Sequence, residues 1–357
     1  MKSNYDILGN HIRLIDTRNR ESITDRVLGI NIDKFFMPSV ANVIGTDLSK
    51  YKLITKGKFA CNPMHVGRDE RLPVALYDEE EPAIVSPAYF MFEVIDNSIL
   101  NEDYLMMWFR RPEFDRICWL HTDGSVRGGI TWDDICRLEL PIPPIENQLE
   151  IVNSYKTITE RIALKQKIND NLDDTAQTLY QKYFESNSDK SSWKQGTVGD
   201  VLQLQRGHDL PRTEMTGGKY PVAGSTGTIG YHDEFTAEAP VIVMGRSGNI
   251  GNPRLYLCNC WTHNTSLYVK QIYEAEPLWV FYLLKNLNYD GFVGGSAVPT
   301  LNRNDVHAYG IAIPPLELQK SFSQKVMSLI YCKEENLSEI EKLQELQKII
   351  LTTMSSR

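Results

Sequence analysis

Apolar side chains recur at seven-residue spacing in two long stretches of the chain. The first stretch runs from Pro144 to about Glu185 without a glycine or a further proline, and the second runs from Pro315 towards the end of the sequence. A seven-residue apolar repeat predicts a helix with one face packed against another helix. Each stretch of about 40 residues would span roughly 60 Å as one α-helix.

The apolar positions of the two stretches predict a helix–helix seam. Polar residues interrupt it near the middle, at Lys165 and Asn169 in the first stretch and at Lys333 and Asn336 in the second. Polar residues in such a seam cost stability but fix the register of an antiparallel pair. The alternative is that they lie at the solvent edge of an imperfect repeat. The predicted apolar seam residues are Ile151, Ile158, Ile162, Leu172, Leu179, Phe322, Leu329, Ile340, Leu343 and Ile350.

A repeated tract immediately before each stretch shows that the chain is a tandem duplication. Leu140–Gln148 reads LPIPPIENQ, and Ile311–Gln319 reads IAIPPLELQ, 171 residues later. The same offset aligns Gly124 with Gly295 and Asp134 with Asp305. Proline is tolerated where a helix begins, and glutamate in the first turn complements the helix dipole. Each tract therefore marks the change from a globular head to a helix, and duplication favours a function that needs two similar sites.

The segments before the two tracts have the pattern of β-rich α/β (α+β) heads. In the second head, short apolar runs at 241–244, 254–257 and 266–269 predict strands, and 277–287 predicts a helix. The first head shows related segments in similar order: 59–62 in the place of 241–244, 85–92 in the place of the strand after Asn264, and 100–109 in the place of the helix. The predicted division is a first head at 1–143, a helix at 144–185, a linker at 186–192, a second head at 193–314 and a helix at 315–357.

Composition and charge narrow the class of protein. The chain is 42% hydrophobic with a net charge of -8, and residues 1–140 hold 17 basic and 22 acidic side chains, so any affinity for DNA should be modest and depend on partners. The N-terminus lacks an apolar run of signal-peptide length, and no stretch approaches a membrane span. A cytoplasmic protein with no membrane partner is expected, with six free and mostly buried cysteines.

Two glycine-rich loops and one cysteine pair are candidate sites of other kinds. Residues 224–230 and 245–251 resemble phosphate loops, but each is followed by further strands and lacks Gly-Lys-Ser/Thr, which favours turns. Cys258, Cys260 and His263 lack a second ligand pair, so no metal is expected. No catalytic motif appears in the sequence, and a non-catalytic chain is predicted.

Small polar and basic side chains on the predicted loops are candidates for DNA contact. Arginine makes bidentate contacts to guanine or phosphate, and short polar side chains reach base edges. In the first head these are Arg68, Arg71, Arg110, Arg111 and Arg127. In the second head they are Arg206, Ser225, Thr226, Arg246, Ser247, Asn249, Asn264 and Thr265.

Several segments resemble the specificity subunit of type I restriction-modification systems. In the second half these are Tyr220–Tyr231, Val243–Gly251, Trp261 with Asn264-Thr265, and Gly295-Ser296 through Leu301–Arg303 to the tract ending at Gln319. In the first half, Val85–Tyr89 and Gly128–Trp132 are similar to family segments. The resemblance covers nearly the whole chain, as two target recognition domains that are each followed by a helical region.

The resemblance implies a DNA sequence-specificity subunit. Each recognition domain would read one half of a split target in double-stranded DNA, while the antiparallel helices set the gap and dock two methyltransferase subunits. Those partners would bind S-adenosylmethionine, flip out an adenine and methylate N6, and restriction/translocase subunits would use ATP and Mg²⁺ to cleave unmodified DNA. No cofactor is expected on this chain. The alternatives are a non-enzymatic coiled-coil scaffold and a detached recognition half of a fused restriction-methylation enzyme.

Overall fold

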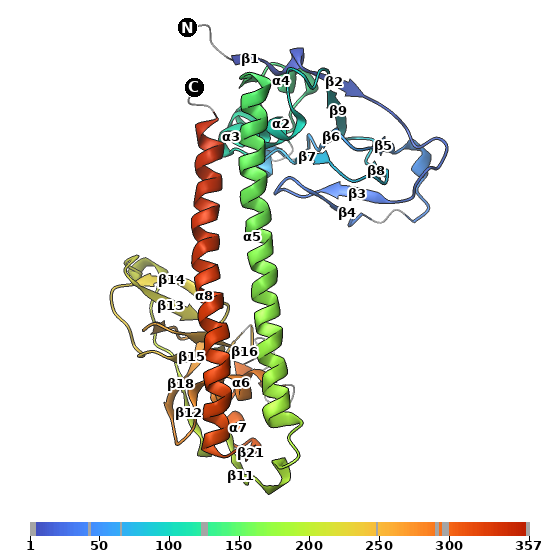
Figure 1. The fold of residues 1–357 in the computed structure, drawn as a ribbon. Coiled ribbons are helices and arrows are strands. Elements are labelled where there is room, and N and C mark those ends of the chain that lie inside the picture. Colours follow the sequence, from blue (N-terminus) through green and yellow to red (C-terminus); the bar gives the residue numbers. More distant parts are fainter. Residues whose placement is uncertain are drawn as a thin grey trace. The chain divides into compact units, whose positions relative to one another are not determined.

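The computed structural model divides the chain into two compact units that are described separately. Unit 1 comprises Met1–Leu164 and Glu339–Arg357, and unit 2 comprises Lys165–Ser338. Within them the structure describes residues 5–41, 44–64, 66–122, 128–247, 249–289, 293–294 and 300–354. Each unit contains one globular head and a part of both long helices, α5 (Ile145–Tyr180) and α8 (Leu316–Thr353) (Figure 1).

The head of unit 1 is built on two four-stranded sheets (Figure 1). One sheet has the strand order β2-β9-β6-β7 and the other has the order β4-β3-β8-β5. In addition, β1 pairs with β10. The strands are β1 (Tyr5–Ile7), β2 (Ile12–Ile15), β3 (Val27–Ile30), β4 (Phe36–Pro38), β5 (Lys52–Ile54), β6 (Lys58–Cys61), β7 (Val74–Tyr77), β8 (Ala83–Val85), β9 (Phe90–Val94) and β10 (Glu139–Pro141). The helices are α1 (Val66–Asp69), α2 (Glu102–Phe109), α3 (Pro112–Leu120) and α4 (Trp132–Cys136).

The head of unit 2 has a related topology, with three strands instead of four in its second sheet. Its four-stranded sheet has the order β12-β18-β15-β16, its three-stranded sheet β14-β13-β17, and β11 pairs with β21. The strands are β11 (Lys194–Thr197), β12 (Leu202–Arg206), β13 (Tyr220–Gly224), β14 (Gly227–His232), β15 (Val241–Gly245), β16 (Gly251–Tyr256), β17 (Trp261–Thr262), β18 (Ser266–Ile272), β19 (Val293–Gly294), β20 (Thr300–Leu301) and β21 (Gly310–Ile313). The helices are α6 (Pro277–Asn286) and α7 (Arg303–His307).

The predicted correspondence between the heads is confirmed, with one correction. β6 and β15 hold the same place in their sheets, as do β9 and β18, and α2 and α6 follow them in the chain. The expected single strand over 85–92 is wrong, because the chain turns at Ser86–Tyr89 and divides that segment between β8 and β9. Pro87 lies in this turn, where a residue without a backbone N–H is tolerated.

The repeated glutamine after each Pro-Pro pair fastens a helix to its head in the same way twice. Gln148 is fully buried, and its Oε1 accepts from the Asn101 backbone N–H at 2.9 Å while its Nε2 donates to the Pro143 carbonyl at 2.8 Å. Gln319 accepts from the Glu276 N–H at 2.9 Å and donates to the Pro314 carbonyl at 2.8 Å. Asn101 and Glu276 are the N-caps of α2 and α6. The repeated tract therefore joins α2 in the first head and α6 in the second head to the long helix that follows each head.

The two long helices run antiparallel within each unit. In unit 1, Arg161 donates to Glu339 at 2.6 Å and Gln347 donates to Thr159 at 2.7 Å. Ile151 and Ile350 pack on one core cluster together with Val152 and Met354 of the helices and the buried residues of the head. In unit 2, Phe322 and Val326 of α8 share a core with Ala176 and Tyr180 of α5. All ten predicted seam residues are buried or half-buried.

The structure decides between the two interpretations of the polar seam residues. Asn169 and Asn336 are 6% and 7% exposed, and the Asn336 Nδ2 donates to the Asn169 Oδ1 at 2.9 Å. The Lys165 Nζ donates to the Asn336 Oδ1 at 2.8 Å, and the Lys333 Nζ donates to the Asp173 carboxylate. The asparagine pair therefore lies inside the seam, as required for a role in register, and Lys165 and Lys333 flank it with partners of their own.

The cysteines are divided between the core and the surface. Cys61, Cys118 and Cys260 are buried, whereas Cys258 and Cys332 are exposed, so only half of the six thiols are in the core. Burial raises the pKa of Cys260 to about 12. Among the described residues there is no group of three His, Cys, Asp or Glu side chains placed to hold a metal ion. In the same residues no helix combines the length and apolar character needed to cross a bilayer.

Candidate nucleic-acid interface

The eight candidate residues of the second head lie together at one edge of its sheets. They come from the end of β12, the β13–β14 turn, the β15–β16 loop and the β17–β18 turn. Backbone hydrogen bonds hold these four segments side by side: His208 N donates to Thr262 O at 2.7 Å, His263 N to Ala223 O at 2.9 Å, and Arg246 N to Thr265 O at 3.1 Å. Four segments that are separate in the sequence thus form one surface.

Side-chain hydrogen bonds link the candidates to each other. The Ser225 N–H donates to the Thr265 Oγ1 at 3.4 Å, and the Asn249 Nδ2 donates to the Ser225 carbonyl at 3.3 Å. Arg206 is exposed, and its Nε donates to the Asn264 carbonyl at 3.4 Å. Thr226 is exposed at the tip of the β13–β14 turn. The arrangement leaves hydroxyl, amide and guanidinium groups at one surface, the mixture that reads base edges and phosphates.

The two glycine-rich loops are tight turns, as predicted. Gly224–Gly230 lies in the β13–β14 hairpin, and Gly245–Gly251 connects β15 to β16. A side chain on Gly245 would place its Cβ 1.5 Å from the Asn249 carbonyl oxygen. Glycine is required there because the loop folds back on its own first residue. Neither loop opens a helix, which excludes the dinucleotide fingerprint.

Two residues of this surface are not selected by the sequence pattern. Asp209 accepts a hydrogen bond from the Asn264 Nδ2, and the His263 Nδ1 lies 2.9 Å from the Thr265 Oγ1. The Thr265 backbone N–H also donates to the His263 Nδ1, at 3.4 Å. An acidic residue is not expected at a phosphate-binding surface, so composition alone does not indicate Asp209. In the sequence, His263 stands out only beside Cys258 and Cys260, where a hydrogen-bonded histidine rather than a metal ligand is expected.

In the first head the corresponding loop carries two of the five predicted arginines. Arg68 and Arg71 lie between β6 and β7, in the place that the β15–β16 loop has in the second head. The Ile130 N–H donates to the Pro63 carbonyl at 3.2 Å, as the Leu301 N–H donates to the Arg246 carbonyl at 2.8 Å. Arg68 pairs with Asp69 and Arg71 with Asp33, at 2.6 and 2.9 Å. Both arginine side chains remain more than half exposed, at 56% and 51%.

The other predicted arginines of the first head fare differently. Arg110 is exposed and lines a cavity of 670 Å³ together with Arg71. The prediction that Arg111 contacts DNA is wrong. Only 8% of its side chain is exposed, and it pairs with Glu113 at 3.4 Å between α2 and α3. A side chain buried in the core of the head does not reach a DNA surface. Arg127 and the Gly295-Ser296 segment lie outside the described residues.

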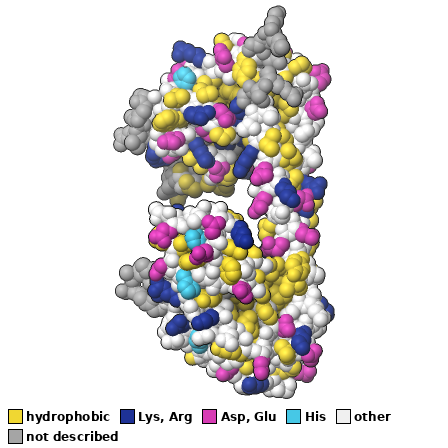
Figure 2. All heavy atoms as spheres, turned by 90° about the vertical axis from the view of Figure 1, so that its left-hand side faces the viewer, with side chains coloured by type: hydrophobic (Ala, Val, Ile, Leu, Met, Phe, Trp, Pro, Cys, Tyr) yellow, Lys and Arg dark blue, Asp and Glu magenta, His cyan; other side chains and the backbone are white. Residues whose placement is uncertain are grey.

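Charges of both signs share the molecular surface. On the face shown in Figure 2, basic and acidic side chains are interspersed over the described residues rather than gathered by sign. This matches the segment counts in the sequence and the net charge of -8. Contacts to DNA would therefore depend on a few placed side chains more than on a general positive field.

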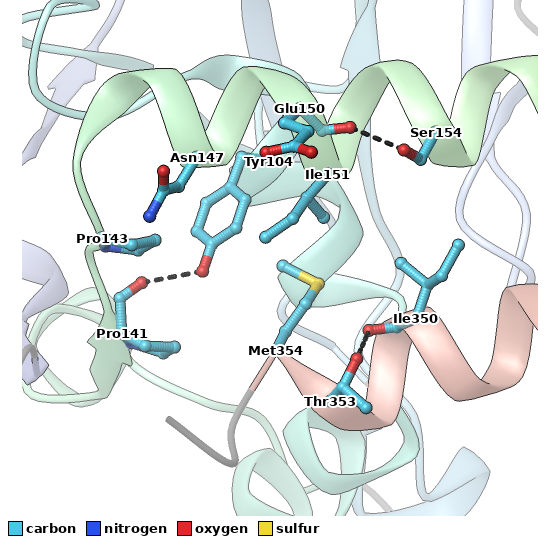
Figure 3. Close-up of a pocket in the computed structure, with 10 residues that line it drawn as sticks. All are labelled: Tyr104, Pro141, Pro143, Asn147, Glu150, Ile151, Ser154, Ile350, Thr353 and Met354. Carbon is cyan, nitrogen blue, oxygen red and sulfur yellow. Dashed lines mark hydrogen bonds between the residues drawn. The ribbon is translucent and has the colours of Figure 1, made fainter.

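A second surface feature is a cavity beside the first Pro-Pro tract in unit 1. It has a volume of 540 Å³ and lies between the head, the start of α5 and the end of α8 (Figure 3). Ile151, Ile350 and Met354 form its apolar wall, and the Tyr104 hydroxyl at its side donates to the Pro141 carbonyl at 3.2 Å. At the positions 171 residues from Ile151 and Met354, unit 2 carries Phe322 and Tyr183, whose rings contact each other at a tilted angle.

Comparison with known proteins finds similar proteins of one kind. Residues 190–349 match the family model of the type I restriction modification DNA specificity domain. A putative type I restriction enzyme MjaX specificity subunit from Methanocaldococcus jannaschii is 21% identical over 98% of this chain and 88% of its own length. The type I restriction enzyme HindI specificity subunit from Haemophilus influenzae is 24% identical over 53% of this chain and 40% of its own length.

Along nearly its whole length the chain is similar to a type I restriction enzyme specificity subunit, and residues 190–349 match the DNA specificity domain of such subunits. Solved structures of such proteins have the same fold. The S subunit of a type I system from M. genitalium superposes with a TM-score of 0.62 over 99% of this chain and 96% of that chain, at 16% identity. A chain from a study of complex assembly and conformational transition of the type I R-M system gives a TM-score of 0.51 over 98% and 96%, also at 16% identity.

The match to the family model lies mainly on the second head. The first head lies outside that match but has the same central strand order. The matched range begins at residue 190, just before β11. The first head also has the same glutamine anchor at its helix. The chain thus contains two heads of one fold with different loops.

Proposed function

We propose that each head of this specificity subunit reads one half of a bipartite target in double-stranded DNA. The observation that carries the proposal is the gathering of eight polar and basic side chains from four segments at one edge of the second head. Arg68 and Arg71 occupy the corresponding loop of the first head. A duplicated head with different loop residues is the arrangement expected for two different half-sites.

We further propose that α5 and α8 set the gap between the half-sites. Each is a single unbroken helix, of 36 and 38 residues, that begins directly after its head and is fastened there by Gln148 or Gln319. In this proposal the length of the paired helices determines the length of the gap. The buried asparagine pair supports one register over others.

The partners in this proposal are two methyltransferase subunits and the restriction subunits that complete the complex. Apolar side chains on the outer faces of the helices are available for docking. In unit 1 these include Leu164, Leu346 and Ile349, which are 59%, 44% and 55% exposed. S-adenosylmethionine, ATP and Mg²⁺ would be bound by the partners, and this chain would contribute no catalytic group.

Exchange of one head tests the proposal. The chain is combined with its methyltransferase partner, DNA without adenine methylation is added, and methylated positions are mapped by sequencing. Replacing residues 1–143 by the corresponding head of another specificity subunit should change one half of the recognised sequence and keep the other half. A target that is unchanged after the exchange would contradict the proposal, and the chain without its partner is the negative control.

A further inference from the structure

The orientation of one amide at the DNA-reading edge of the second head is fixed by an acidic residue. The Asn264 Nδ2 donates to the carboxylate of Asp209, 55 residues earlier in the sequence. A carboxylate only accepts hydrogen bonds, so the nitrogen end of the amide has to face Asp209. The Asn264 Oδ1 is therefore the end of the amide that is left to accept a hydrogen bond from a ligand, on a side chain of intermediate exposure.

The backbone around this pair is well anchored. Asp209 follows His208, whose N–H donates to Thr262 O at 2.7 Å, and Asn264 lies between His263 and Thr265, which bond to Ala223 and Ser225. The neighbouring ring is oriented by the same kind of constraint. The His263 Nδ1 contacts Thr265, whose backbone N–H donates to it at 3.4 Å. The Asn264 and His263 side chains are thus each held by a neighbouring residue.

We infer that Asn264 reads a base amino group in the major groove, the N6 of adenine or the N4 of cytosine, and that Asp209 is the positioning residue that makes it an acceptor. Free asparagine offers a donor and an acceptor and often binds adenine through both. In Asn264 the amide nitrogen already donates to Asp209, so only the amide oxygen remains, and it can recognise only a hydrogen-bond donor such as a base amino group. Every base pair carries one major-groove amino group, on the adenine or the cytosine. A hydrogen-bond acceptor held at one place therefore distinguishes adenine or cytosine on a given strand from guanine or thymine on that strand.

This inference rests on the proposed DNA recognition and adds to it the chemistry of one contact. It also explains why an acidic side chain lies at a surface that binds a polyanion. Asp209 is exposed and would repel phosphate, which costs affinity. The cost is offset if the carboxylate supplies selectivity by fixing the amide.

The test substitutes Asp209→Asn in the complete chain and combines it with the methyltransferase partner. An amide side chain at position 209 can bond to Asn264 in either amide orientation, so the loop stays anchored while the direction of the Asn264 amide becomes free. Genomic DNA that lacks N6-methyladenine is the probe, and methylated sites are mapped by single-molecule sequencing. Asp233→Asn is the matched control, since it removes one carboxylate from an exposed position after β14 of the same head.

The wild-type complex should discriminate at one position of the second half-site by about tenfold, the effect of one good hydrogen bond. Asp209→Asn should lower that discrimination towards one at this position alone, Asn264→Ala should do the same, and Asp233→Asn should behave as wild type. A role in folding alone would reduce methylation at every site and leave the preferred bases unchanged.

Three results would overturn the inference. Wild-type base preferences in both Asp209→Asn and Asn264→Ala would remove the contact and leave the proposed function intact. If Asp209→Asn abolishes methylation altogether, the test rests on Asn264→Ala, and an unchanged base preference in that variant would overturn the inference. Methylation without any sequence preference in the wild-type complex would overturn the proposed function together with the inference.

Discussion

The buried asparagine pair in the helix seam predicts that single substitutions lower the stability of the seam and that the double substitution restores it. Asn336→Leu removes the donor to the Asn169 Oδ1 and the acceptor of the Lys165 Nζ. Asn169 is 6% exposed, so its amide oxygen would be left without a partner, at a cost of about 1 to 3 kcal/mol. Asn169→Leu removes the acceptor of the Asn336 amide nitrogen and should lower the stability by a similar amount.

The double variant should recover most of this loss. With leucine at both positions no amide is left unpaired in the seam, and each buried leucine contributes roughly 1.5 to 3 kcal/mol of apolar burial. Lys165 is half-buried and extends its ammonium group to water along the helix. We therefore expect the double variant to be as stable as the wild type or more stable, with a coupling energy of about 2 kcal/mol or more between the two sites.

Hydrogen exchange measures this locally. Exchange of the α8 amides at 333–340 is followed as a function of urea, so that opening of the seam is separated from the unfolding of the heads. Ser328→Leu, an exposed position of α8, is the control for added apolar surface. Single-variant effects that simply add in the double variant would refute the reasoning, because independent sites share no hydrogen bond.

Three further predictions address the joints, the docking faces and the spacing. Gln148→Leu leaves the Asn101 N–H and the Pro143 carbonyl without their partner and should lower the stability of unit 1 by about 3 kcal/mol; Asn147→Leu, which introduces the residue type found at the equivalent position 318, should cost little in the same thermal melt. Leu346→Glu with Ile349→Glu should weaken methyltransferase binding at least tenfold by calorimetry without changing the melting temperature, whereas unchanged binding would exclude this face. One heptad inserted in both α5 and α8 should lengthen the gap in the target and keep both half-sites; an unchanged gap would reject the helices as its determinant.

Much of the fold follows from the sequence because it rests on local periodicity and on repetition. The apolar heptads predict both long helices, and the 171-residue offset predicts that Gln148 and Gln319 have the same role. Local pattern also predicts the hairpins at Gly224–Gly230 and Gly245–Gly251, since these turns depend on neighbouring residues.

The remainder depends on contacts between residues far apart in the chain. Arg111 follows an exposed arginine and looks equivalent to it, but packing of α2 against α3 buries it. The Asp209–Asn264 contact joins residues 55 positions apart and appears only when β12 and the β17–β18 turn lie side by side. In sequence, Asn169 and Asn336 are equally compatible with a buried seam and a solvent edge, because heptad position alone does not fix how deep a polar residue lies.

The central claim is that two heads of one chain read two halves of one DNA target. It is tested most directly by mapping N6-methyladenine in the DNA of cells that carry this chain with its methyltransferase partner, compared with cells that lack only this chain. The account predicts a single asymmetric target of two defined half-sites separated by a gap of fixed length and unspecified sequence, absent without the chain. A continuous target, or the same methylation in cells that lack the chain, would contradict it.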